Sequence, residues 1–150
     1  MNELSSSVRV LAVSPNESDL LILSRIIAHS AWRFESASSV AEAKRSLTTH
    51  QAHVVVCDRK LSDGDWKDML DVITAHPNPP QLIVVSKDAD ERLWAEVLNC
   101  GAWDVLLKPF HPKEVYQGIH LAWRHWQGGC RTRGRVAGSK TANTRQFATA

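Results

Sequence analysis

The sequence predicts an α/β protein, a doubly wound parallel sheet of five strands with helices on both faces. Short apolar runs alternate five times with segments of helical periodicity. Only a few residues connect each run to the next segment, which favours parallel strands joined by helical crossovers. The third run, His53–Cys57, is continuously apolar and rich in Val, a pattern typical of a central strand covered on both faces.

The first half of the chain supplies two strands and two helices before this central strand. Val8–Val13 is the first strand, and Asn16 can cap the helix that follows it. Trp32–Ala37 is a short second strand. Ser39 and Glu42 have the spacing of a capping box, which predicts the start of the second helix.

The second half begins where the central strand ends, at Asp58. A polar loop then leads to a third helix at Trp66–Ala75, which a proline-rich stretch terminates. Leu82–Ser86 is the fourth strand. Asp90 starts the fourth helix, and Gly101 is expected as its left-handed cap.

Trp103–Leu107 is the fifth strand, Pro112 starts the fifth helix, and Gly128-Gly129 is expected to stop it. The chain of 150 residues is therefore expected to form one domain, residues 8–126, after an extension at residues 1–7. Residues 127–150 hold five Lys/Arg and no acid, which predicts a basic, disordered tail or linker. Its spaced charges lack aromatic interleaving, so they indicate only weak or indirect contact with nucleic acid.

Composition also favours a cytoplasmic setting. Cys57, Cys100 and Cys130 show neither metal-ligand nor paired spacing. No apolar run approaches the roughly 20 residues that cross a bilayer, and the N-terminus lacks the order of a signal peptide. We therefore expect no membrane association.

Polar residues follow four of the predicted strands. They are Ser14-Pro15, Asp58, Ser86-Lys87 and Lys108-Pro109. The carboxyl ends of parallel strands meet at one edge of a sheet, where functional groups gather. An acid, a hydroxyl group and an ammonium group are therefore expected to converge.

The chain resembles the receiver domains of two-component response regulators, which have a flavodoxin-like fold with strand order 2-1-3-4-5. The resemblance covers residues 8–126 and rests on Asp58 in VVVCD, Ser86 in LIVVS, and Lys108 in GAWDVLLKPF. It implies that Asp58 accepts a phosphoryl group from a histidine kinase or phosphotransfer protein. Ser86 and Lys108 would bind the phosphoryl oxygens, with a cis peptide at Pro109 aiming Lys108 at the site.

This chain differs from the family at the Mg²⁺ site. Ser14 and Pro15 stand where receivers carry an acidic pair, which leaves Asp58 as the only obvious charged metal ligand and predicts weak or no Mg²⁺ binding. A nearby ammonium could partly replace the cation. Ser14 and Pro15 also fit an ordinary turn, and Asn16 or Glu17 is considered as a substitute ligand.

Four other residues are considered as modulators. Lys60 and Lys87 lie beside the expected site, although solvated loop lysines are the ordinary interpretation. Val105 replaces the aromatic residue that reports switching in the family. Trp66 stands where a glycine is common, either covering the site or packing in the core.

Three functions are compared. The first is a phosphoacceptor signalling domain, with no enzymatic activity beyond self-catalysed phosphotransfer and dephosphorylation. The alternative is a pseudo-receiver that binds partners without phosphorylation. A flavodoxin-like redox protein ranks third, because the loop after the first strand has no glycine to close on a phosphate.

Four tryptophans on the fourth helix, fifth strand and fifth helix indicate a homodimer surface there, with core packing as the competing interpretation. They are Trp94, Trp103, Trp123 and Trp126.

Overall fold

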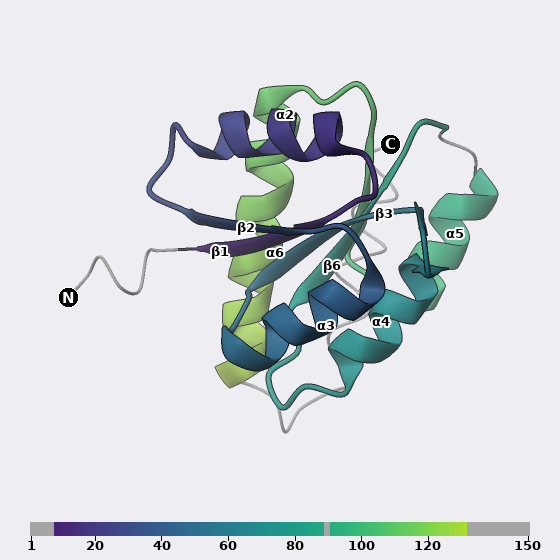
Figure 1. Ribbon diagram of the computed structural model, residues 1–150. Coiled ribbons are helices and arrows are strands. Elements are labelled where there is room, and N and C mark those ends of the chain that lie inside the picture. Colours follow the sequence, from purple (N-terminus) through teal and green to yellow (C-terminus); the bar gives the residue numbers. More distant parts are fainter. Residues whose placement is uncertain (1–7, 89–90, 132–150) are drawn as a thin grey trace.

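A computed structural model describes residues 8–88 and 91–131, with side chains described to residue 128, and shows a five-stranded parallel sheet (Figure 1). The strand order is β2-β1-β3-β6-β7, which is the predicted order of the five main strands in the chain. The prediction of a doubly wound α/β fold is therefore confirmed. The strands are β1 (Arg9–Val13), β2 (Arg33–Ala37), β3 (Val54–Asp58), β6 (Gln81–Ser86) and β7 (Asp104–Leu107).

Helices cover both faces of the sheet (Figure 1). Residues of the central strand alternate between two cores: Val54 and Val56 pack on one side, and Val55 and Cys57 on the other. Burial on both faces explains why this strand is continuously apolar. The first side is covered by α2 (Glu17–Ile27) and α6 (Pro112–Arg131), and the second by α3 (Val40–Thr49), α4 (Trp66–Thr74) and α5 (Glu91–Asn99).

Most of the expected helix boundaries carry their expected caps. The Asn16 side chain accepts a hydrogen bond from the Ser18 backbone N–H and begins α2. Ser39 accepts from the Glu42 N–H, although the Glu42 carboxylate bonds to Ser38 instead of completing the box with Ser39. Gly101 adopts a φ of 100° after α5, a conformation that favours glycine. Asp90, expected to start this helix, lies outside the described residues.

The segment after Asp58 is more ordered than the polar loop that the sequence predicts. It forms a short antiparallel hairpin, β4 (Lys60–Leu61) and β5 (Gly64–Asp65). Asp65 then caps α4 in a reciprocal capping box with Asp68. Asp63, in the turn, accepts hydrogen bonds from two backbone N–H groups at the start of α3. The hairpin thus connects the starts of two helices.

The expected stop at Gly128-Gly129 is wrong, because α6 continues to Arg131. A glycine inside a helix costs about 1 kcal/mol relative to alanine, which weakens a helix without forbidding it. The preceding turns pack Val115, Ile119 and Ala122 into the core, so the helix is already established when it reaches the glycines.

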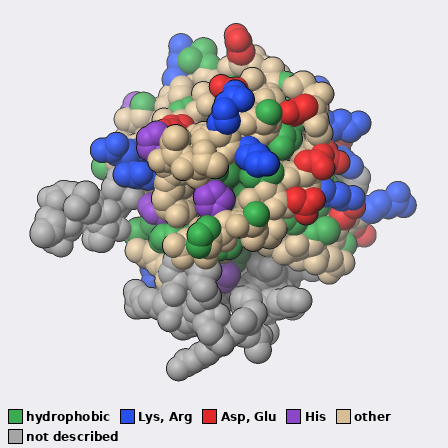
Figure 2. Space-filling model, turned by 60° about the horizontal axis from the view of Figure 1, so that its bottom comes forward, with side chains coloured by type: hydrophobic (Ala, Val, Ile, Leu, Met, Phe, Trp, Pro, Cys, Tyr) green, Lys and Arg blue, Asp and Glu red, His purple; other side chains and the backbone are tan. Residues whose placement is uncertain are grey.

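The tryptophans divide between core and periphery. Trp103 is buried and stacks on His125, while Trp94 packs half-buried against the core under α5. Trp123 and Trp126 near the end of α6 are half-buried. On the face shown in Figure 2, charged side chains of both signs and several histidines surround small hydrophobic patches. Within the described residues, no helix is long and apolar enough to cross a membrane.

Candidate functional site

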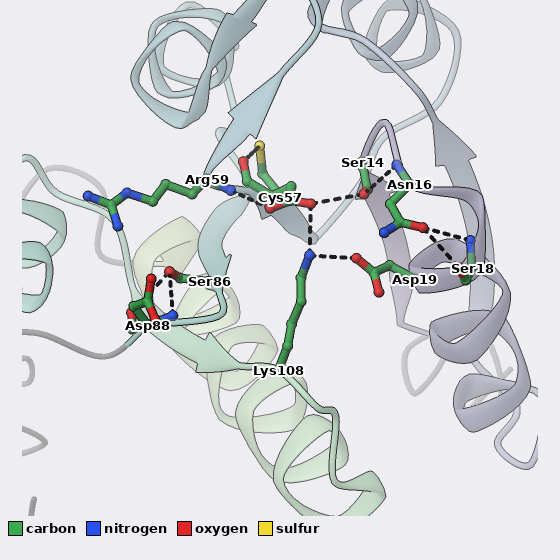
Figure 3. Close-up of polar contacts among 10 residues, drawn as sticks. Ser14, Asn16, Ser18, Asp19, Cys57, Arg59, Ser86, Asp88 and Lys108 are labelled. Carbon is green, nitrogen blue, oxygen red and sulfur yellow. Dashed lines mark hydrogen bonds and ion pairs between the residues drawn. The ribbon is translucent and has the colours of Figure 1, made fainter.

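Asp58, the last residue of β3, accepts hydrogen bonds from three residues on the carboxyl edge of the sheet. Figure 3 shows the polar cluster to which Ser14, Asp19 and Lys108 belong. The Oδ2 atom of Asp58 accepts hydrogen bonds from the Ser14 hydroxyl at 3.0 Å and from the Lys108 ammonium at 3.1 Å. Its Oδ1 accepts from the Arg59 backbone N–H at 2.9 Å. The side chain is 15% exposed, so the carboxylate is satisfied by protein donors while it keeps some access to solvent.

Lys108 follows β7, which forms the edge of the sheet two strands away from β3. The Lys108-Pro109 peptide is cis, as the resemblance implied. The ammonium group lies between two carboxylates, those of Asp58 and Asp19, and the side chain is 16% exposed. Burial alone would lower the pKa of Lys108, but its contacts with Asp19 and Asp58 outweigh burial and hold the pKa above the usual 10.5.

Asp19 is a member of this cluster that the sequence analysis missed. It lies in the first turn of α2, and its side chain is 13% exposed. The family's acidic pair directly follows the first strand, whereas Asp19 comes later in the chain, inside the helix. The available signal was the cap at Asn16, because side chains in a helix point back toward its N-terminus and thus toward the sheet edge where the helix begins.

Ser14 bridges the first strand to the site. The residue is 5% exposed, and its hydroxyl donates to Asp58 while accepting from the Asn16 backbone N–H at 3.0 Å. Its own N–H donates to the carbonyl of Ala37. Pro15 is exposed. Asn16 and Glu17, considered as substitute ligands, are also exposed, and Asn16 serves as the helix cap.

The Ser86 side chain lies apart from the side chains of Ser14 and Lys108 (Figure 3) and bonds to Asp88 instead. Its hydroxyl donates to the carbonyl of Asp88 and accepts from the backbone N–H of the same residue. The side chain is buried, and the Ser86 carbonyl accepts from the Lys108 backbone N–H. The hydroxyl that the sequence assigned to phosphoryl binding is therefore engaged by its own loop.

The four expected modulators divide into two groups. Lys60 and Lys87 are exposed, and neither appears among the hydrogen bonds and ion pairs of Asp58 within the described residues. Trp66 is 3% exposed and packs in the core under α4, so it does not cover the site from outside. Val105 is buried in the same core.

Cys57 precedes Asp58 and points into the core. It is fully buried, and its Sγ lies 3.2 Å from the Asp58 carbonyl oxygen. Burial, reinforced by the charges of Asp58 and Asp65, raises the pKa of this thiol far above its usual value. The thiol is therefore neutral and contributes packing to the strand that carries Asp58.

The family model for the response regulator receiver domain matches residues 10–120. The chain belongs to this family. Receiver domains are signalling domains of two-component systems, and they interact with histidine kinases or phosphotransfer proteins. The family model and the resemblance agree over most of the region identified from Asp58, Ser86 and Lys108.

Curated relatives include two regulatory proteins. The photosynthetic apparatus regulatory protein RegA of Cereibacter sphaeroides is 26% identical over 117 residues, which cover 78% of this chain and 64% of that protein. The acid tolerance regulatory protein ActR of Rhizobium meliloti is 26% identical over 110 residues, which cover 73% of this chain and 57% of that protein. The chain thus spans less than two thirds of the length of either relative.

Solved structures show the same fold. The signal receiver domain of an HD domain-containing protein from Pseudomonas fluorescens is 21% identical with a TM-score of 0.75, covering 87% of this chain and 94% of that one. The beryllofluoride-activated NtrC4 receiver domain dimer is 25% identical with a TM-score of 0.73, covering 79% of this chain and 98% of that one.

Receiver domains generally bind Mg²⁺ for phosphorylation, and at this site both carboxylates that could ligate a cation already contact the Lys108 ammonium. In residues 8–88 and 91–131, no group of three or more His, Cys, Asp or Glu side chains is arranged to hold a metal ion. Mg²⁺ demands oxygen ligands in octahedral geometry. Here both Asp58 oxygens already accept from protein donors, and the Lys108 ammonium lies between Asp58 and Asp19.

Proposed function

We propose that this receiver domain accepts a phosphoryl group on Asp58 from a histidine kinase or phosphotransfer protein, with little dependence on Mg²⁺. The observation that carries the proposal is the Lys108 ammonium, 3.1 Å from Asp58 Oδ2 at the carboxyl edge of the sheet. A carboxylate on a partly accessible edge, with a cation beside it, has the elements of a phosphoryl acceptor.

The chemistry assigns a role to each residue. A carboxylate oxygen of Asp58 attacks the phosphorus of a phosphohistidine, the P–N bond breaks, and the electron pair leaves with the imidazole. Lys108 stabilises the negative charge on the phosphoryl oxygens during this displacement. Ser86 would reach the phosphoryl group only after its hydroxyl leaves the Asp88 backbone, so its role in binding requires a rearrangement of that loop.

Weak metal dependence is supported by the same arrangement. Ser14 occupies a position where an acid would serve a cation, and its hydroxyl donates a hydrogen bond to Asp58. A hydroxyl group satisfies one lone pair of the carboxylate without bringing a charge of its own. Lys108 then supplies the positive charge from within the chain.

The experiment is phosphorylation by acetyl phosphate, in magnesium and in a chelator, followed by intact-mass measurement. We expect the mass of one added phosphoryl group under both conditions, and no adduct in Asp58→Asn. Asp71→Asn is the matched control, because Asp71 is exposed on α4, away from the site. An adduct that forms only with magnesium would contradict the metal independence, and an adduct retained by Asp58→Asn would contradict the acceptor.

A second candidate is the phosphorylation-independent pseudo-receiver. The observation that favours it is the complete set of protein donors on Asp58, together with the engagement of Ser86 by its own loop. This function predicts no adduct in any condition, and partner binding that survives Asp58→Asn. The redox alternative has no comparable support.

Two further proposals concern the boundaries and assembly of the chain. We assign residues 8–126 to the receiver domain and residues 127–150 to a basic linker, beginning within the last turns of α6. A homodimer through α5, β7 and α6 is supported by Leu107, which is 37% exposed on the edge strand β7, and by the half-buried Trp94. Among the structures with this fold, the beryllofluoride-activated NtrC4 receiver domain is a dimer.

A further inference from the structure

Asp19 has a feature that the proposed function leaves unexplained. Its Oδ2 is buried and makes no hydrogen bond of good geometry within the described residues, and its ion pair with the Lys108 ammonium supplies its counter-charge. Glu17, in the same first helical turn, is exposed instead. A carboxylate at the N-terminus of a helix is ordinarily explained by the helix dipole, which Glu17 satisfies from the surface. Asp19 extends inward to the site.

The charges of the cluster place one cation between two anions. Lys108 contacts Asp19 Oδ2 at 2.5 Å and Asp58 Oδ2 at 3.1 Å, so the shorter contact is to Asp19. A phosphoryl group that approaches Asp58 needs the same ammonium to balance its own charge. Asp19 therefore competes with the phosphoryl group for Lys108. The negative charge of Asp19 also repels the phosphoryl group.

We propose that Asp19 is a positioning residue that restrains the phosphorylation of Asp58 by holding Lys108. The inference rests on the proposed function, since it concerns the rate of that reaction. In the absence of phosphoryl donors, Asp19 keeps the ammonium in the site and prevents Lys108 from leaving for solvent. During phosphoryl transfer, the ammonium group must move away from Asp19 and toward the oxygens of the phosphoryl group on Asp58.

The step is balanced with acetyl phosphate as the donor. An Asp58 oxygen forms a bond to phosphorus, the bond from phosphorus to the acetyl oxygen breaks, and acetate leaves with the electron pair. Neither oxidation nor a further reactant is required. Asp19 does not touch the phosphorus, so its effect is exerted through the position and charge balance of Lys108.

The test compares initial rates of phosphorylation of the full chain by acetyl phosphate, followed by intact mass. In Asp19→Asn, a neutral amide replaces the carboxylate beside Lys108, so the shape of the side chain is kept and the competing charge is gone. We expect the rate to rise about tenfold, which corresponds to about 1.4 kcal/mol of lost restraint. Asp19→Glu, which restores the charge, should return the rate toward that of the parent. Glu17→Gln removes the same charge from the same helix turn and should leave the rate unchanged.

A second measurement follows the Lys108 ammonium directly by nitrogen-15 NMR. Its signal should move in Asp19→Asn and stay in place in Glu17→Gln, whether or not the protein is phosphorylated. Asp19→Ser provides another neutral variant if Asp19→Asn folds poorly. An adduct that forms at the parental rate or more slowly in folded Asp19→Asn overturns the inference alone. Failure of the parent and every variant to form an adduct overturns the proposed function and the inference with it.

Discussion

At the scale of single residues, the Lys108 ammonium forms ion pairs with two carboxylates, those of Asp19 and Asp58. Removal of one partner from a buried ion pair typically costs 3–5 kcal/mol, because the remaining charge lacks compensation. The Lys108 side chain retains 16% exposure, so water can compensate in part. We expect Lys108→Met to lose about 2 kcal/mol of unfolding free energy at neutral pH. Urea denaturation measures this loss, with Lys113→Met, a change at an exposed lysine on α6, as the control.

The stability difference between the parent and Lys108→Met should also depend on pH. The pKa of folded Lys108 is raised above 10.5, so its contribution to stability is fully present below that pH and is lost as pH rises through the folded pKa. The difference in unfolding free energy between the parent and Lys108→Met should therefore be constant from pH 7 to about 10 and shrink above it. A difference that grows in alkali would contradict the ion pairs.

Sequence patterns located the site but not its charge balance. Asp58 and Lys108 follow strands, so the edge at which they meet could be predicted from the parallel topology alone. Asp19 lies inside a helix, and its direction depends on the angle at which α2 leaves the sheet. Ser86 could be assigned to the edge, but the choice between Asp58 and the Asp88 backbone depends on a loop conformation that residue types do not specify.

At the scale of elements, two histidines connect the starts of strands to the end of α6. The Nδ1 of His53 accepts the Arg9 backbone N–H, and the His53 ring lies 4.4 Å from that of Trp126. His125 stacks on Trp103 at 4.6 Å. Burial lowers the pKa of both histidines, and the charge of Arg9 adds to this effect for His53. Both rings therefore favour the neutral form more strongly than an exposed imidazole does.

This arrangement predicts a loss of stability in mild acid. With folded pKa values below 6.5, the unfolded chain binds more protons, so unfolding free energy falls as pH drops below about 6.5. Protonation at His53 also removes the acceptor for Arg9. His53→Gln and His125→Gln should each flatten the decline between pH 7 and 5 in urea titrations, whereas His29→Gln, at an exposed position, should not. If unfolding free energy fell equally with pH in the parent and all three variants, the roles of His53 and His125 in this decline would be contradicted.

The elements themselves were predictable where periodicity and caps agree. Asn16, Ser39 and Gly101 each mark a helix end that the structure contains. The hairpin at β4 and β5 was missed because each strand has only two residues, too few for any alternation of polarity. The two turn residues, Ser62 and Asp63, are types common in turns and were the available signal. Gly128 misled because tertiary packing of α6 outweighs local propensity.

At the scale of the whole molecule, the proposed dimer surface lies on the edge of the sheet beside the site. Leu107 is exposed on β7 directly before Lys108. A movement of Lys108 on phosphorylation would therefore also displace Leu107 and alter a surface that includes it. We expect light scattering to show a larger mass after phosphorylation, and Leu107→Glu to abolish the increase. Leu21→Glu, at a more exposed leucine on α2, should leave the increase intact. A monomer under both conditions would contradict the proposed assembly.

The buried thiol of Cys57 makes the opening of the acceptor strand measurable. Alkylating reagents attack thiolates, so they can modify this cysteine only when the end of β3 opens to solvent and the proton can leave. Cys100 is exposed and provides an internal reference in the same chain. The ratio of the two labelling rates therefore reports how often the backbone beside Asp58 opens, and ligands that tighten the polar cluster should slow the labelling of Cys57.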